Sequence, residues 1–90
     1  MNYFDLAISK IKDERDRQDA KWGAHRKMND FSWLTVIIEE IGEVARAILQ
    51  NRNDDVYMEL IQVAAVAVAW LECIYEFDIN RQDNTDFKIG

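Results

Sequence analysis

Proline is absent from this sequence and glycine occurs only three times, so few residues interrupt regular secondary structure. This scarcity favours long helices over a succession of turns and hairpins. Cys73 is the only cysteine, which excludes an intrachain disulfide and is typical of a protein of the reducing cytoplasm. The first residues lack a basic segment followed by an apolar run, so we expect no signal peptide there.

A long uninterrupted apolar segment is also missing. The longest run, residues 60–71, is broken by Gln62, whereas a membrane-spanning helix needs ~20 apolar residues. We therefore expect a core helix and no membrane partner. Positive charge is scarce, with 11 basic against 17 acidic residues and a net charge of −6. Such a surface repels nucleic acids, which we do not expect as partners, and it repels nucleotides unless bound cations intervene.

The remaining composition is that of a folded protein, with 49% hydrophobic and 31% charged residues. We predict an all-α fold in a single domain, residues 1–90, with a core over residues 3–77. An N-terminal helix over about residues 3–20 precedes a loop and a helical hairpin over about residues 30–50 and 53–77. The polar tail, residues 78–90, has room for a short element around Phe87.

Apolar positions predict how these helices pack. In the second helix one face carries an apolar stripe, which we expect to face the core. The segment 63–71 is apolar on every side, more than two other helices can cover, and this predicts a homodimer or homotetramer that completes the bundle. We expect His25 to be solvated and Trp33, Trp70 and Cys73 to be packing residues. The stripe consists of Leu34, Ile37, Ile41, Ala45 and Ile48.

Acidic side chains gather on the two helices of the hairpin. Glu39, Glu40 and Glu43 span about 100° of the second helix, a single face. Glu59 and Gln62 lie one turn apart near the start of the third helix. The hairpin brings this part of the third helix close to the acidic residues of the second. Carboxylate and amide oxygens converging in this way suit Mg²⁺ or Mn²⁺.

An ordinary solvated surface is the alternative for this acidic face. Arg46 follows Glu43 by three residues, so the two side chains can form a surface ion pair. The third helix argues against that alternative, because the face of Glu59 continues into Val63 and Val66. A carboxylate against an apolar surface is costly unless it is paired or bound to a metal.

The segments RDRQDAKWG, EEIGEVARAIL and ELIQVAAVAVAWLE together resemble the MazG-like all-α nucleoside triphosphate pyrophosphohydrolases. The resemblance covers about residues 12–76 and is strongest to a phage or bacterial subgroup. In that family an ExxE pair on one helix and an ExxD motif on the next bind the metal. Glu40 and Glu43 match the first pair, and Glu59 matches the leading acid of the second motif. Gln62 stands where the family has aspartate, so one ligand brings an oxygen but no charge.

The resemblance implies a bundle completed by oligomerisation and an enzyme that hydrolyses a phosphoric anhydride. A nucleoside or deoxynucleoside triphosphate would yield monophosphate and pyrophosphate, with Mg²⁺ as cofactor and Mn²⁺ as a possible substitute. Glu39, which the family's ligand set leaves free, is the candidate general base. The candidate substrate contacts are Trp22, stacked on the base, and Lys21 and Arg46, bound to phosphates.

A non-catalytic helical interaction module is the rival interpretation. It keeps the oligomeric all-helical fold and uses the acidic face to bind a basic partner. The replacement of aspartate by Gln62 favours it. Saturable stabilisation by Mg²⁺ distinguishes the two, because a ligand bound only to the native state raises the melting temperature.

Overall fold

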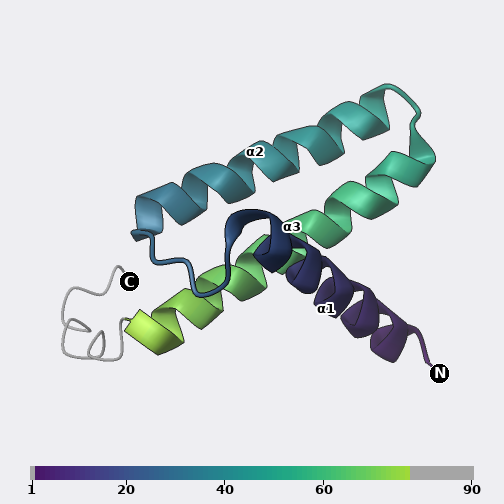
Figure 1. The fold of residues 1–90 in the computed structure, drawn as a ribbon. Coiled ribbons are helices and arrows are strands. Elements are labelled where there is room, and N and C mark those ends of the chain that lie inside the picture. The colour runs from purple at the N-terminus through teal and green to yellow at the C-terminus, as the bar shows by residue number, and fades with distance from the viewer. Residues whose placement is uncertain (1, 78–90) are drawn as a thin grey trace, which may run out of the picture.

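The computed structural model describes residues 2–77, and over this range it contains three α-helices and no strand. They are α1 (Tyr3–Trp22), α2 (Asp30–Leu49) and α3 (Asn53–Phe77) (Figure 1). The prediction of an all-α fold with three helices is confirmed, with bounds within about two residues of those expected. The element suggested around Phe87 lies outside the described residues.

Local capping interactions set the ends of the helices. The Asn2 side chain accepts a hydrogen bond from the Asp5 N–H at 2.7 Å, and that of Asn29 accepts one from the Ser32 N–H at 2.9 Å. Each of these bonds satisfies one of the free N–H groups of a first turn. At the end of α1, Gly23 has a φ of 93°, a conformation that side chains disfavour, and its N–H donates to the Asp19 carbonyl.

The central element is α3, which packs against both α1 and α2. It forms an antiparallel hairpin with α2, closed by a short turn at residues 50–52, while α1 crosses α3 at a steep angle (Figure 1). The turn residue Asn51 has a φ of 56°, which asparagine tolerates better than most residues. The hairpin therefore places the middle of α2 beside the first half of α3, and α1 reaches α3 from another side.

A core cluster fixes the rotation of α2 and α3 about their axes. Trp33, only 1% exposed, packs with Val66, Ala69 and Cys73 of α3. On the edge of this cluster the Trp70 indole N–H donates to the Asp30 carboxylate at 2.9 Å. The predicted packing roles of Trp33, Trp70 and Cys73 are thus confirmed.

Most of the apolar stripe predicted for α2 does not face this core, and of its residues only Ile37 packs against the cluster. Ile41 is 50% exposed and Ile48 is 57% exposed, whereas Trp33 and Ala47 are buried against α3. The prediction was wrong because α2 is apolar on more than one face. The largest side chain, Trp33, has the most area to bury and so decides which face turns inward. Part of the stripe is left on the surface.

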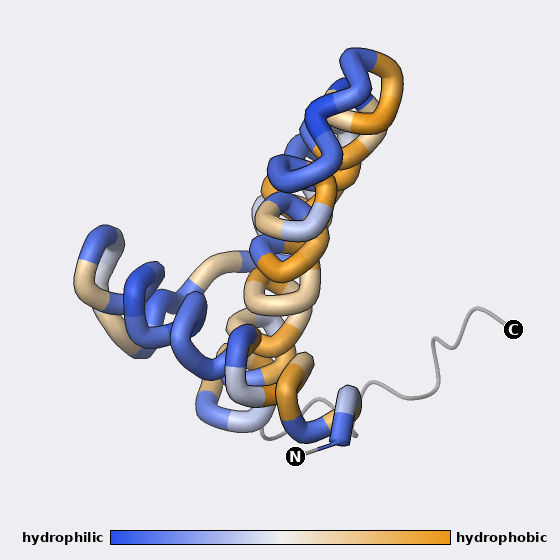
Figure 2. The backbone as a smooth tube through the Cα atoms, turned by 90° about the vertical axis from the view of Figure 1, so that its right-hand side faces the viewer, coloured by the Kyte–Doolittle hydropathy of each residue, from blue (hydrophilic) through white to orange (hydrophobic). Residues whose placement is uncertain are grey.

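Much apolar surface is exposed in the single chain, and apolar residues make up much of the hairpin (Figure 2). By length and composition alone α3 is apolar enough to cross a membrane, yet only 22% of its most apolar 18-residue window is buried. Tyr3 is 90% exposed and Leu60 is 57% exposed. An apolar groove of about 440 Å³ separates α1 from α3. It is lined by Tyr3, Leu6, Ala7, Lys10, Ile11, Tyr57, Leu60, Ile61 and Ala64.

Candidate metal centre

Three of the predicted metal ligands meet between α2 and α3. With its amide nitrogen facing the two carboxylates, Gln62 donates to Glu40 Oε2 at 2.9 Å and to Glu59 Oε2 at 3.1 Å. All three side chains are half-buried. The antiparallel hairpin brings them together because Glu40 lies in the middle of α2 and the other two lie in the first half of α3.

The Glu59 carboxylate is close enough to oppose the ionisation of Glu40. Burial raises the pKa of Glu40, and the charge of Glu59 and a hydrogen bond with it raise this pKa further. The charges of Glu43 and Glu14 act in the same direction. Two like charges in a half-buried position are relieved by a proton or by a bound cation.

The spacing of these groups fits a small hard cation. Rotation of the Gln62 amide by 180° places Oε1 where the nitrogen stood, 2.9 Å and 3.1 Å from the carboxylate oxygens. Neighbouring oxygens around an octahedral Mg²⁺ with bonds of 2.0–2.1 Å lie about 2.9 Å apart. Within residues 2–77 no three His, Cys, Asp or Glu side chains form a metal-binding group. A cation between these two carboxylates would therefore need the amide oxygen of Gln62 as a third ligand.

The other two predicted acids lie differently. Glu43 accepts a hydrogen bond from Arg46 Nη1 at 2.6 Å, which is the surface ion pair considered as an alternative from the sequence. Its charge still acts on Glu40. Glu39 is exposed, and no hydrogen bond or ion pair joins it to the cluster in the described part of the chain. The structure thus brings together Glu40, Glu59 and Gln62 and leaves Glu39 and Glu43 outside this contact.

Helix α1 adds groups to the centre that the sequence analysis missed. Arg17 donates to both oxygens of Glu14, at 2.9 Å and 2.6 Å, and this contact lowers the pKa of Glu14 although burial opposes it. The charges of Glu14 and Arg17 both act on Glu40. Gln18, 1% exposed, donates to Glu14 at 3.3 Å. The segment around Gln18 is mostly polar, so the spacing of apolar residues did not indicate that this glutamine is buried.

An open groove of about 340 Å³ lies beside the centre. The side formed by α1 carries two cations, Lys10 and Arg17, and two acids, Asp13 and Glu14, while Gln62 belongs to the other side. The groove therefore combines charges of both signs with the Gln62 amide of the centre.

The predicted substrate contacts lie in two places. Lys21 and Trp22 are at the end of α1, where the charge of Lys21 acts on Glu14 and its ammonium lies 4.8 Å from the centroid of the Trp22 ring. Arg46 is on α2, paired with Glu43.

Comparison with known proteins gives no match, whether to a protein-family model, to a curated protein sequence or to a solved structure. What the centre does is accordingly argued from its own residues.

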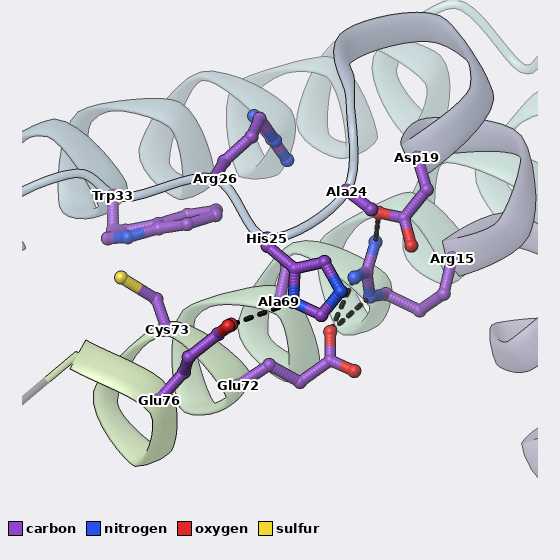
Figure 3. A pocket seen from close by; sticks show the side chains of 10 residues that line it. All are labelled: Arg15, Asp19, Ala24, His25, Arg26, Trp33, Ala69, Glu72, Cys73 and Glu76. Atoms are coloured by element: carbon purple, nitrogen blue, oxygen red, sulfur yellow. Dashed lines mark hydrogen bonds and ion pairs between the residues drawn. The ribbon is translucent and has the colours of Figure 1, made fainter. Parts of the chain in front are cut away.

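A second polar cluster joins the loop after α1 to the last turns of α3 (Figure 3). His25 is solvated as expected, with 73% of its side chain exposed, and its Nδ1 also lies 2.8 Å from Glu76 Oε2. The reason is that His25 adopts a φ of 58° in this loop and reaches the end of α3. Next to it Arg15 binds Glu72 of α3 and Asp19 of its own helix.

We expect the His25–Glu76 pair to make stability depend on pH. The hydrogen bond to Glu76, and then its charge, raise the pKa of His25. A raised pKa in the folded state means that the pair stabilises the protein below the unfolded pKa of ~6.5 and that this stabilisation is lost as pH rises through the folded value. His25 is the only histidine in the sequence, so its imidazole signals are easily identified in an NMR spectrum. Their titration midpoint should lie at lower pH in Glu76→Gln than in the wild type. An unchanged midpoint would contradict the pair.

The centre also predicts a difference between two glutamates three residues apart. In EDTA, Glu40→Gln should raise the melting temperature, by ~4–8 °C for each kcal/mol of repulsion removed. The matched change Glu43→Gln should lower it slightly, since it breaks an exposed pair worth roughly 0.2–1 kcal/mol. Thermal unfolding followed by circular dichroism measures both. Equal effects of the two variants would show that Glu40 is no closer to other carboxylates than Glu43 is.

Proposed function

We propose that this protein is a Mg²⁺-dependent pyrophosphohydrolase that cleaves a nucleoside or deoxynucleoside triphosphate into monophosphate and pyrophosphate. The observation that carries the proposal is the convergence of Glu40, Glu59 and Gln62 beside a groove lined by Lys10 and Arg17. A chain with a net charge of −6 needs bound cations to hold a polyanion, and the centre is where they fit.

Each group has a task in this reaction. Glu40, Glu59 and the Gln62 amide oxygen would hold Mg²⁺ or Mn²⁺, and Glu43 can join them when it leaves Arg46. A bound divalent cation neutralises the phosphates and lowers the pKa of water. Arg17 and Lys10 bind phosphate oxygens. Glu39 is the proposed proton acceptor for the attacking water, because it is exposed on α2 and accessible to water.

The resemblance of the motifs to MazG-like enzymes supports the same proposal, since that family uses this chemistry. Gln62 is the departure from the family pattern, and it has a physical consequence. An amide in place of a carboxylate removes one negative charge, so the metal should bind more weakly than at an all-carboxylate site. Millimolar Mg²⁺ is the appropriate starting condition for an assay.

The direct test is a screen of common nucleoside and deoxynucleoside triphosphates for pyrophosphate release with Mg²⁺ and with Mn²⁺. We expect at least one substrate to yield pyrophosphate and monophosphate, and Glu59→Gln to lose most of this activity. Asp16→Asn, an equal change of charge on the exposed side of α1, is the matched control and should keep it. Orthophosphate as first product, or no release with either metal, contradicts the proposal.

A helical interaction module is the second candidate, and one observation favours it. The two hydrogen bonds from Gln62 satisfy Glu40 and Glu59 without any metal, so the cluster can also serve as a structural network. Such a protein would bind a basic partner through its acidic face. Its melting temperature would not rise saturably with Mg²⁺, whereas that of a metal enzyme must.

We further propose that the protein works in the cytoplasm as a homodimer or homotetramer. The support is the apolar surface of the single chain: the groove between α1 and α3, the outer stripe of α2 and the small buried fraction of α3. Contiguous apolar patches of this kind mark interaction sites. The carboxylates Glu40 and Glu59 on the same hairpin argue against insertion into a membrane, because charge in hydrocarbon is costly.

This assembly predicts the behaviour of Leu60→Glu. Leu60 is 57% exposed in the single chain, so the substitution should change the stability of a monomer by no more than about 0.5 kcal/mol. If the α1–α3 groove is the interface, however, the new charge is buried without a partner and the assembly dissociates. Light scattering at micromolar concentration should show an oligomer for the wild type and a smaller species for the variant. A monomeric wild type contradicts the assembly.

A further inference from the structure

A small cavity lies apart from the metal centre, enclosed by the end of α1, the loop after it and the second half of α3 (Figure 3). Its volume is about 120 Å³, and its wall includes Arg15, Arg26, Trp33 and Glu72. That space is too small for a whole nucleotide and suits a planar base alone.

Most charged groups of this wall are already paired. Arg15 is bound to Glu72 and, at 3.0 Å, to Asp19, and His25 is bound to Glu76. Arg26 is different, because no hydrogen bond or ion pair to it occurs within residues 2–77. The N–H groups of its guanidinium are therefore the donors that this cavity has available for a ligand.

Two indoles hold the guanidinium of Arg26. It lies 5.5 Å from the centroid of the Trp22 ring and 5.0 Å from that of Trp33. A cation over an aromatic ring is attracted by the π-system and needs no N–H donor for this, so the two contacts leave the N–H donors of Arg26 available. Partial burial and the charge of Arg15 lower the pKa of Arg26, while the charge of Asp19 acts in the opposite direction. N–H donors that no protein acceptor occupies gain from an acceptor supplied by a ligand.

The cavity and the metal centre are connected through α1. Buried Gln18 donates to Glu14 of the centre at 3.3 Å, and its Oε1 accepts a hydrogen bond from Arg15 of the cavity at 3.5 Å. Glu14 and Asp19, one at each place, are five residues apart, which is about 7.5 Å along a helix and about 140° around it. One ligand with phosphates at the centre and a ring in the cavity would thus reach around α1 as well as along it.

We propose that this cavity recognises the base of a guanine nucleotide, with Arg26 donating to O6 and N7 of the ring; the inference rests on the proposed function of the neighbouring centre. Free donors select a base edge that carries acceptors. Guanine presents two adjacent acceptors, O6 and N7, which match the arginine fork, whereas adenine presents one acceptor and one donor there. Arg26 is accordingly the specificity residue, and Trp33 is the support that orients it.

Binding of nucleoside monophosphates in EDTA tests this pocket without the metal reaction. The indole N–H signal of Trp33 is the reporter, since this buried group has no hydrogen-bond partner within residues 2–77. We expect GMP to shift it saturably, IMP to bind about as well because it keeps O6 and N7, and AMP to bind about tenfold more weakly or worse. Equal binding of AMP and GMP, or no binding of GMP, overturns the proposal.

Variants separate the pocket from the proposed reaction. Arg26→Lys keeps the charge but loses the fork, so it should bind GMP about tenfold more weakly and no longer distinguish it from AMP. Arg52→Lys, at the turn between α2 and α3, is the matched control and should bind like the wild type. Glu59→Gln should also keep GMP binding. If the protein prefers GMP but releases no pyrophosphate, the base pocket is supported and the proposed enzyme activity is refuted. If it releases pyrophosphate without preferring GMP, the activity is supported and the base pocket is refuted.

Discussion

The carboxylates of Glu40 and Glu59 face each other across the packed interface of α2 and α3, and the hairpin holds them there. Two unit charges ~4 Å apart repel by about 4 kcal/mol at an effective dielectric of 20. Hydrogen bonds to charged groups contribute roughly 1.5–3 kcal/mol each, so the two bonds from Gln62 offset a repulsion of similar size. Without a metal, the repulsion between the carboxylates and the hydrogen bonds from Gln62 therefore nearly cancel in free energy. A bound cation would replace the repulsion by attraction and so stabilise the folded protein.

The rest of the molecule can be understood from this contact. Trp33 and the apolar face of α3 keep the hairpin in register, which prevents the two carboxylates from moving apart. Helix α1 crosses the same hairpin and brings Arg17 to the centre, where the proposed reaction needs a cation for phosphates. One turn further along, α1 ends at the cavity that holds Arg26. The acidic centre and the cationic groups around it thus arise from the crossing of three helices, and the apolar surface that remains is available to a second copy.

The sequence predicted the parts of this arrangement that depend on local pattern. Helix bounds followed from caps and from the scarcity of breakers, and the meeting of Glu40 with Glu59 followed from an antiparallel hairpin with a short turn. The orientation of α2 could not be predicted in this way, because a helix that is apolar on several faces has no single face that periodicity assigns to the core. The size of Trp33 determined which face is buried. The place of Arg26 depends on a loop that folds back over α3, a contact between distant residues that no spacing along the chain reveals.

Direct measurement of metal binding tests the central claim, that the groups between α2 and α3 form a cation site. Free Mn²⁺ has a strong electron paramagnetic resonance signal, which decreases when the ion binds to a protein. We expect the wild type to take up Mn²⁺ saturably, Glu59→Gln to take up much less at the same concentrations, and Asp16→Asn to behave like the wild type. A wild type that leaves the Mn²⁺ signal unchanged, or an equal loss of binding in both variants, would contradict the account.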